Sequence, residues 1–328
     1  MADAKLIKGF NEIPAEDYYV SGHRTCAGCG PALGYRLVTK AAGPNTILLG
    51  PTGCMYVANG HQFLSSPYAV PWYHTQLGAG GPAGIGTAAA LRILMFKGKR
   101  RREDVNVIVY GGDGGMADIG LSGLSMGLTY DYPRLLYLLY DNESYANTGV
   151  QASSTTPFGS STTFTPSGKV KPIGNERLKK DMALIAAAHP SIGYVATASL
   201  SYPVDLINKV RKALNSGRPS LVQLLAPCPK GWAFPPEETV EIGQLAVDTG
   251  LWVLWEYERG RFRITDKPRS RRRVREYVSK QGRFSHLREN EAALEYMQLS
   301  VDEQWETWEE MDKTGKIILP WTPPFHSR

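Results

Sequence analysis

The chain has 328 residues, of which 42% are hydrophobic and 21% charged, and its formal net charge is +6. This composition is ordinary for a folded globular protein, and four cysteines are too few for the disulfide framework of a small secreted domain. The polar, acidic N-terminus lacks the pattern of a signal or transit peptide, and no apolar run approaches the roughly 20 residues that span a bilayer. We therefore expect a cytoplasmic protein without a membrane span.

The first hundred residues alternate between irregular and regular segments. The pattern predicts an irregular arm, a Gly/Cys turn with a helix, a strand, an aromatic loop without a clean period, and a helix rich in small residues. These segments are, in order, residues 1–20, 23–43, 46–50, 55–76 and 78–98. The glycines of the last segment lack the G-x-G-x-x-G spacing and no predicted strand precedes them. We therefore expect a closely packed helix there rather than a dinucleotide site.

Beyond residue 100, predicted strands alternate with predicted helices. The strands are 105–110, 134–140, 194–198 and 221–226, and the helices are 118–129, 178–189 and 203–217. This alternation predicts an α/β fold with a doubly wound, mostly parallel sheet. Because its crossovers are right-handed, the carboxyl ends of the strands meet at one edge, which is where such sheets bind ligands.

The regular alternation of predicted strands and helices ends near residue 240. A predicted helix and an aromatic hairpin around Arg259 and Gly260 are followed by a charged, helical segment and a Pro-rich tail. We divide the chain into an N-terminal arm (1–20), a cofactor-binding domain (21–240) and a mixed C-terminal extension (241–328) that contacts other subunits.

Two stretches concentrate the basic residues, KGKRRR at 97–102 and PRSRRRVR at 268–275. Neither is interleaved with aromatic residues or accompanied by a nucleic-acid-binding motif, so we expect no nucleic-acid partner. We interpret both stretches as solvated surface, with docking of an acidic partner as the alternative.

The predicted strand at 105–110 leads into an unusual sequence, GGDGGMADIG, in which an apolar run ends in glycines around an aspartate. Gly and Asp form strands poorly, so this Gly-Asp-Gly is expected to be an exposed tip. Glycines let a chain approach phosphate closely, and the N-terminus of the next helix offers N–H groups to it. Asp113 would be repelled by phosphate unless a cation lies between them.

A second set of oxygen ligands follows the next strand, in DNESYANTG at 141–149. Mg²⁺ takes few protein oxygens and completes its octahedron with phosphate and water. Asp113, Asn142 and a backbone carbonyl would supply those oxygens at one edge of the sheet. The alternative is that both sequences are ordinary turns at strand ends.

The four cysteines form a second group. Cys26 and Cys29 make a C-x-x-C in a Gly-rich loop, Cys54 follows in T-G-C, and Cys228 lies far away in P-C-P-K-G-W. Four thiolates suit a 4Fe–4S cluster or zinc, although structural zinc usually takes two local pairs. A turn with two unrelated buried cysteines is the remaining alternative.

A GDG followed about thirty residues later by Asn is the thiamine diphosphate motif. Together with CAGCG, PTGC, APCPKGW, YDNESYANTGVQASSTTPFG and EYVSKQGRFSHL, this chain resembles the β subunit of the pyruvate:ferredoxin oxidoreductases and their 2-oxoacid:acceptor relatives. The resemblance runs from about residue 20 to residue 290. It implies the thiamine diphosphate-binding fold for residues 21–240.

The resemblance assigns roles to individual residues. It implies that the side chains of Asp113 and Asn142 and the carbonyl of Ser144 bind Mg²⁺, and that Asn147 lies near the thiazolium and the 2-oxoacid as a catalytic residue. It implies a 4Fe–4S cluster on Cys26, Cys29, Cys54 and Cys228. The remaining residues implied to bind the cofactor are Gly112, Gly114, Gly115, Tyr145 and Thr148. Met116 departs from some relatives, which affects only the packing around the cofactor.

The resemblance also implies the reaction and the partners. The expected activity is oxidative decarboxylation of a 2-oxoacid, with pyruvate leading, to acyl-CoA and CO₂, with coenzyme A as co-substrate and ferredoxin or another acceptor taking the electrons. The chain offers no convincing glutamate to activate thiamine, so an α subunit is expected to supply it together with part of the substrate site. Subunits of the γ and δ type would carry further clusters.

Other functions remain open at this point. The aromatic stretch 55–76 favours, as an alternative, a branched or aromatic 2-oxoacid such as 2-oxoisovalerate, phenylglyoxylate or indolepyruvate, and oxalate is a further one. A non-oxidative thiamine decarboxylase or synthase would need no cysteine quartet. A zinc-binding, basic interaction module would need no thiamine.

Overall fold

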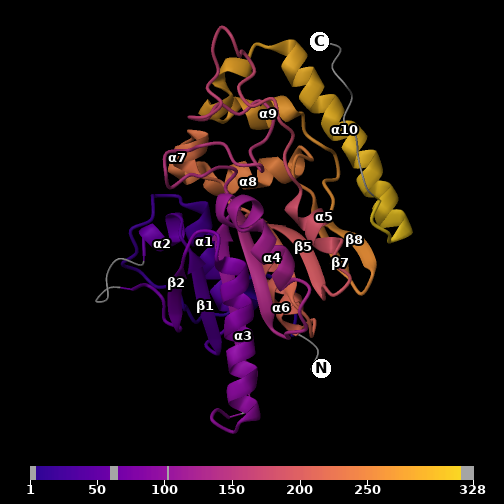
Figure 1. Cartoon of the computed structure of the whole chain (residues 1–328). Helices are drawn as coiled ribbons and strands as arrows, with labels where there is room; N and C mark the ends of the chain where they lie inside the picture. Colours follow the sequence, from indigo (N-terminus) through magenta and orange to yellow (C-terminus); the bar gives the residue numbers. More distant parts are fainter. Residues whose placement is uncertain (1–4, 60–65, 102, 319–328) are drawn as a thin grey trace.

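Strands β1 to β8 form one sheet in the computed structural model of the chain, which describes residues 5–59, 66–101 and 103–318 (Figure 1). The strand order is β2-β1-β3-β4-β6-β5-β7-β8. Strands β1 to β6 pair in parallel, whereas β7 runs antiparallel to β5 and β8 antiparallel to β7. The predicted doubly wound, mostly parallel sheet is confirmed. The strands are Thr46–Pro51, Trp72–Thr75, Asn106–Gly112, Leu135–Asp141, Tyr194–Ser199, Ser220–Leu225, Leu254–Glu258 and Arg261–Asp266.

Helices cover both faces of this sheet, which explains why its central strands are apolar throughout. In β3, Val107 and Val109 belong to one hydrophobic core, while Ile108 and Tyr110 belong to a second core on the opposite face. The first face is covered by α3 (Gly80–Phe96), α4 (Leu121–Gly127) and α5 (Met182–Ala187). The second is covered by α1 (Gly30–Ala42) and α6 (Pro203–Asn215).

Three sequence predictions differ from the structure. The stretch 55–76 contains most of a short helix, α2 (Cys54–Val57), and an edge strand, β2; residues 60–65 lie outside the described part. Strand β2 pairs only with β1 and is half exposed, so it lacks the apolar pattern of a buried strand. A strand therefore does precede the glycine-rich helix α3. The helix predicted at 178–189 is shorter, because the Asp181 side chain caps it by accepting a hydrogen bond from Leu184 N.

The glycines of α3 are explained by close packing, as expected. A Cβ atom at Gly81 would lie 2.2 Å from the backbone carbon of Gly123 in α4. A Cβ at Gly84 would lie 2.8 Å from the Val109 side chain of β3. The two glycines thus allow α3 to approach both the neighbouring helix and the sheet.

The C-terminal part of the chain joins the same core. Strands β7 and β8 extend the sheet, and Trp308 of α10 (Glu291–Thr314) packs against Trp255 and Phe262 with ring centroids 6.1 and 5.9 Å apart. The helices of this region lie beyond the carboxyl edge of the parallel strands (Figure 1). The remaining elements are η1 (Phe10–Glu12), η2 (Gly114–Ile119), α7 (Pro229–Trp232), η3 (Pro236–Glu238), α8 (Thr239–Asp248), α9 (Val274–Ser279) and η4 (Gly282–Leu287).

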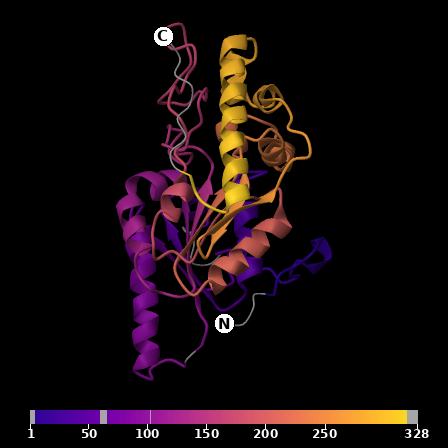
Figure 2. The ribbon, with the colours of Figure 1, turned by 90° about the vertical axis from the view of Figure 1, so that its right-hand side faces the viewer.

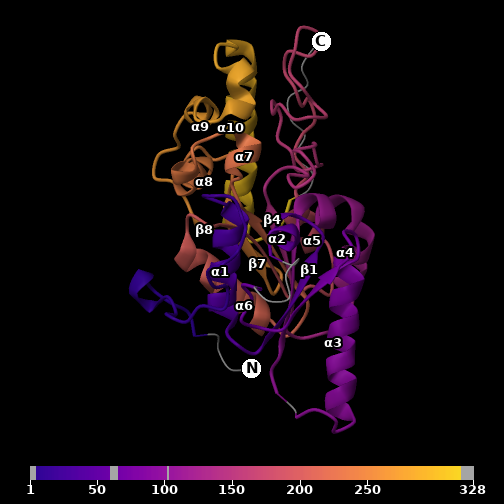
Figure 3. The ribbon, with the colours of Figure 1, turned by 90° about the vertical axis from the view of Figure 1, so that its left-hand side faces the viewer.

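A long loop, residues 142–181, connects β4 to α5 and stands beside α10 above the sheet (Figures 2 and 3). The Phe158 and Tyr296 rings meet there, 4.8 Å apart. The loop and the C-terminal helices together cover the edge at which the strands end.

Surface features agree with the composition. The arginines at 269, 271–273 and 275 are exposed, while Arg102 and the Pro-rich tail 319–328 lie outside the described residues. Within the described ranges, none of the helices is both long and apolar enough to cross a membrane.

Candidate functional site

Asp113 and Asn142 meet at the carboxyl edge of the sheet, as the sequence predicted. They follow β3 and β4, which are neighbours with Gly112 opposite Tyr140. Asp113 directly precedes a π-helix, η2 (Gly114–Ile119). The expectation of an exposed tip was wrong, because Asp113 is completely buried. The loop after β4 covers it, and Thr155 Oγ1 lies 3.0 Å from Asp113 Oδ2.

The Asn142 amide lies between two further oxygen atoms. One end of the amide is 2.9 Å from Asp113 Oδ1 and 2.8 Å from the Ser144 carbonyl oxygen, and its nitrogen donates to both when turned that way. With the amide oxygen turned there instead, three oxygens face one another. Adjacent ligands of an octahedral Mg²⁺ with bonds of about 2.0–2.1 Å lie about 2.9 Å apart. These three residues therefore fit the ligand set of a magnesium ion.

The electrostatics of Asp113 agree with this fit. Burial, and then the neighbouring Asp141 carboxylate, raise the pKa of Asp113 well above its ordinary value. Among the described residues, no Lys or Arg forms an ion pair with it. A bound divalent cation would supply the missing positive charge.

The glycines around Asp113 face protein atoms. A Cβ at Gly114 would lie 2.4 Å from the Tyr145 ring, one at Gly115 would lie 3.0 Å from Leu77, and one at Gly112 would lie 3.1 Å from the Tyr140 ring. Packing alone therefore requires small residues at these positions. Their approach to phosphate stays a prediction.

Asn147 and Thr148 lie outside this buried cluster. They occupy an exposed turn closed by a hydrogen bond from Tyr145 N to Gln151 O of 2.9 Å. Thr148 Oγ1 lies 2.5 Å from Gln151 Oε1. The catalytic role of Asn147 stays a prediction.

Sequence reasoning missed the polar residues that support the site. Asp141 is buried beside Asn142 and accepts hydrogen bonds from Lys179 (2.7 Å) and Gln223 (2.8 Å), and Thr155 Oγ1 lies 2.9 Å from it. The only signal for these residues was the charged run Asp-Asn-Glu at the end of an apolar strand. Lys179 and Gln223 carried no signal, because they fall in an ordinary predicted helix and an apolar strand.

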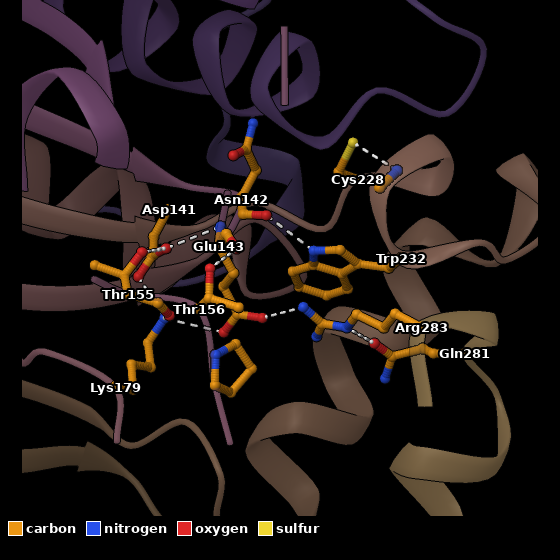
Figure 4. Close-up of polar contacts among 12 residues, drawn as sticks. Asp141, Asn142, Glu143, Thr155, Thr156, Lys179, Cys228, Trp232, Gln281 and Arg283 are labelled. Carbon is orange, nitrogen blue, oxygen red and sulfur yellow. Dashed lines mark hydrogen bonds and ion pairs between the residues drawn. The ribbon is translucent and has the colours of Figure 1, made fainter. Parts of the chain in front are cut away.

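Glu143 is the second missed residue. It is buried and forms ion pairs with Lys179 (3.0 Å) and Arg283 (2.6 Å), as Figure 4 shows. Burial disfavours the Glu143 carboxylate, but the charges of Lys179 and Arg283 outweigh it and hold its pKa below the ordinary value. Its side chain points away from that of Asn142 (Figure 4). Two cationic side chains thus favour the charged form of the Glu143 carboxyl group.

The four cysteines converge although they are far apart in sequence. Cys29 and Cys228 each precede a helix, α1 and α7, and Cys54 begins α2. Burial, and then the nearby Cys228 and Cys26, raise the pKa of Cys29 to about 12. Burial and the other three thiols likewise raise the pKa of Cys54 to about 12. These mutual charge effects indicate that the four cysteines lie in one region of the fold.

Two glycines bring the C-x-x-C loop to Cys228. A Cβ at Gly28 would lie 2.2 Å from the Pro236 carbonyl oxygen, and one at Gly30 would lie 2.4 Å from that of Pro227. Gly28 also has a φ of +66°, which favours glycine. Within the described ranges, no three His, Cys, Asp or Glu side chains are close enough to hold a single metal ion.

Trp232 connects the cysteine region to the end of β4. Its indole nitrogen donates to the Asn142 carbonyl (2.9 Å), and the Arg283 guanidinium lies 3.8 Å from the centre of its ring (Figure 4). In the same short helix, Gly231 N donates to Cys228 Sγ at 3.3 Å. The candidate cation site and the cysteines are therefore parts of one packed unit.

Comparisons with known proteins show which family the chain is similar to. Residues 51–224 match the family model of the thiamine pyrophosphate enzyme, C-terminal TPP-binding domain. The chain is 47% identical over 294 residues to pyruvate synthase subunit PorB of Methanocaldococcus jannaschii, covering 89% of this chain and 97% of that one. It is 41% identical over 296 residues to ketoisovalerate oxidoreductase subunit VorB of Pyrococcus abyssi, covering 90% and 93%.

A solved structure has the same fold. The chain is similar to one in the 2-oxoglutarate:ferredoxin oxidoreductase from Magnetococcus marinus, a structure with 2-oxoglutarate, coenzyme A and succinyl-CoA bound. The TM-score is 0.51 at 19% identity, and the match covers 73% of this chain and 84% of that one. At this identity the likeness is one of fold.

Proposed function

Since the chain belongs to the family of 2-oxoacid:ferredoxin oxidoreductase subunits with a thiamine pyrophosphate domain, we propose that it is the β subunit of such an enzyme and binds thiamine diphosphate, Mg²⁺ and one 4Fe–4S cluster. When bound, the thiamine supplies the carbon nucleophile that decarboxylates a 2-oxoacid, and the cluster accepts single electrons. We further propose a cytoplasmic location, where free cysteines stay reduced.

The proposal depends most on the position of the Asn142 amide, which lies 2.9 Å from Asp113 Oδ1 and 2.8 Å from the Ser144 carbonyl oxygen. The two side chains and the Ser144 carbonyl would hold Mg²⁺, which in turn would hold the diphosphate. The residues proposed to line the cofactor are Gly112, Gly114, Gly115, Tyr145, Asn147 and Thr148.

The cysteines Cys26, Cys29, Cys54 and Cys228 would hold the cluster. The contacts of Tyr140 support the proposal that the cluster and the thiamine lie close together. The Tyr140 ring packs on Gly112, and its hydroxyl oxygen lies 2.8 Å from where a Cβ atom of Gly53 would be. Gly53 precedes Cys54, and Gly112 precedes Asp113. One aromatic side chain thus contacts both turns.

We propose pyruvate as the 2-oxoacid and coenzyme A as the acyl acceptor. The PorB relative, at 47% identity, supports pyruvate, and the VorB relative, at 41%, keeps 2-oxoisovalerate as the second candidate. Aromatic substrates have less support, because the aromatic side chains that suggested them stack on one another. Tyr68 lies 4.8 Å from Trp72, and Tyr56 lies 3.6 Å from His74, between ring centroids.

We also propose that other subunits complete the enzyme. Both buried glutamates of the described chain, Glu143 and Glu256, are ion-paired carboxylates, so neither suits the role of activating acid. An α subunit would supply that glutamate and part of the substrate site. Subunits of the γ and δ type would carry electrons onward to ferredoxin.

The test is a panel of 2-oxoacids assayed with coenzyme A and a viologen dye on the complex purified with its partners. We expect pyruvate to give the highest kcat/KM and the isolated chain to give no activity. A preference for 2-oxoisovalerate would select the second substrate. A complex free of iron that releases CO₂ without reducing the dye would overturn the proposal in favour of a non-oxidative decarboxylase.

A further inference from the structure

We propose that Glu143 is a positioning residue, which holds Asn142 and Ser144 in the arrangement that faces Asp113, and that Arg283 from the C-terminal extension completes this arrangement. The inference rests on the proposed function, because it assumes that these three residues bind a divalent cation. It assigns a role to two charged residues that the proposed chemistry does not use.

The backbone at Glu143 is the first part of the argument. Its φ is +63°, in the left-handed region that residues with a Cβ atom rarely adopt. Glu143 stands between Asn142 and Ser144, so this turn brings the Ser144 carbonyl back to within 2.8 Å of the Asn142 amide. An extended backbone at Glu143 would move the Ser144 carbonyl oxygen away from the Asn142 amide.

The second part is that Glu143 is held by hydrogen bonds at its backbone and at Oε1, and at Oε2 by the ion pair with Arg283 without a hydrogen bond. Its N–H donates to Asp141 Oδ1 (3.1 Å), and its carbonyl accepts from Thr156 Oγ1 (2.7 Å). Its two carboxylate oxygens pair with Lys179 and Arg283 at 3.0 and 2.6 Å. Strained conformations persist only where the surroundings determine them completely, and here both the backbone and the side chain are held.

Arg283 contributes from a distant part of the chain. It is 5% exposed, and it donates to Gln281 (2.8 Å) and to the Tyr277 hydroxyl (3.0 Å) besides pairing with Glu143. Its guanidinium also lies on the Trp232 ring, whose nitrogen donates to the Asn142 carbonyl. Arg283 therefore acts on both sides of the ligand loop, through Glu143 and through Trp232 (Figure 4).

A buried ion pair that only stabilises the fold is the competing explanation, and the chain contains a matched control for it. Glu256 is also buried, at 3% exposed, and pairs with Lys212 (2.8 Å) and Arg263 (2.5 Å). It lies on β7, at the opposite side of the sheet from β3. Glu256→Gln removes the same kind of interaction without touching the ligand loop.

The experiment measures Mn²⁺ affinity by EPR in the presence of thiamine diphosphate, on the purified complex of all subunits. We expect Glu143→Gln to weaken Mn²⁺ binding about 10- to 100-fold, as loss of a residue that orients metal ligands typically does. Glu256→Gln should leave the affinity within about twofold. Arg283→Met keeps an unbranched side chain over Trp232 and should weaken binding several-fold. The double variant should bind about as weakly as Glu143→Gln alone, because the methionine side chain still covers Trp232 and the remaining effect of Arg283 passes through Glu143.

Each outcome decides the question. Parental affinity in Glu143→Gln, or an equal loss in Glu256→Gln, would overturn the positioning role and leave the proposed function standing. Failure of the parental complex to bind Mn²⁺ would overturn the proposed function, and this inference with it. If Glu143→Gln does not assemble, Arg283→Met decides alone, and parental affinity there would overturn the proposal.

Discussion

Asp113 lies in the core of the protein beside a second carboxylate, Asp141, and burial raises its pKa. Without a cation, a charged Asp113 lowers the stability of the folded chain. With a cation, the same position becomes a strong ligand site. Asp113 is therefore expected to reduce the stability of the metal-free protein.

Asp113→Asn tests whether the charge at this position lowers the stability of the metal-free chain and is needed for cation binding. The metal-free variant should be more stable than the metal-free parent by about 0.5–2 kcal/mol, as is common for neutralised active-site residues, while Mn²⁺ and thiamine diphosphate binding are lost. Urea unfolding and titration with Mn²⁺ measure the two effects. Asp118→Asn is the control: it loses the ion pair with Lys180 (3.1 Å), so it should lower stability. A lower stability of the metal-free Asp113→Asn variant would contradict the prediction.

Cys228→Ser separates the cluster from the thiamine site. A serine oxygen can accept the hydrogen bond that Gly231 N now donates to Cys228 Sγ, so the start of α7 should keep its conformation. We expect the variant to lose cluster iron and sulfide and electron transfer to the dye, but to keep its Mn²⁺ affinity. Iron analysis and Mn²⁺ EPR on one preparation check both points. Full electron transfer in the variant would show that Cys228 is not a cluster ligand.

At the level of elements, the site depends on how closely α3 and α4 approach each other. Helix α4 follows the π-helix that begins after Asp113, and α3 packs against it through Gly81 and Gly123. The atoms that a side chain at Gly81 would meet belong to the backbone, which cannot move aside as a flexible side chain can. The contact therefore fixes the distance between the two helices.

Two substitutions in α3 test that contact. Gly81→Ala should destabilise the chain by about 1–3 kcal/mol, because the new methyl group would lie 2.2 Å from Gly123. Gly86 lies in the same helix, and an added Cβ atom there would have no atom of another element within 4 Å. Gly86→Ala should therefore stabilise the chain by about 0.5–1 kcal/mol. Thermal or urea unfolding measures both. Stabilisation by both substitutions would show that helix propensity, and not packing, determines the result.

For the whole molecule, the sheet continues through the C-terminal region, and buried charges join the parts. Glu256 on β7 accepts a hydrogen bond from the Tyr194 hydroxyl of β5 (2.6 Å) and pairs with Lys212 of α6. Burial disfavours the Glu256 carboxylate, but its bonds to Lys212 and Tyr194 hold its pKa below the ordinary value of 4.5. The C-terminal extension is thereby tied to the parallel part of the sheet.

This arrangement predicts sensitivity to acid. A carboxyl group with a lowered pKa stabilises the folded state above its ordinary pKa, and this contribution disappears as the pH falls through the lowered value. Glu256→Gln should cost about 1.5–3 kcal/mol at pH 7. The difference from the parent should shrink as the pH falls below 4.5. Urea unfolding at several pH values checks this, and a difference that stays constant down to pH 3 would contradict it.

Much of the fold could be predicted because local patterns describe it. Apolar strands and amphipathic helices alternate along the chain, and parallel strands end at one edge, so this pattern alone predicts that Asp113 and Asn142 meet. Strand β2 could not be predicted, because an edge strand with one neighbour is half exposed and lacks a clear period. The burial of Asp113 could not be predicted either, because the loop that covers it has no hydrophobic periodicity.

The sequence by itself determined the α/β sheet, the two turns that are proposed to hold the cation, and the kind of chemistry that the cysteines allow. Those features follow from residue type, spacing and the burial of periodic faces, all of which act over short stretches. Only the tertiary structure decided that Glu143 adopts a left-handed conformation between Lys179 and Arg283. The reason is physical: partners for a buried charge are brought together by long-range closure of the chain, which leaves no local pattern in the sequence.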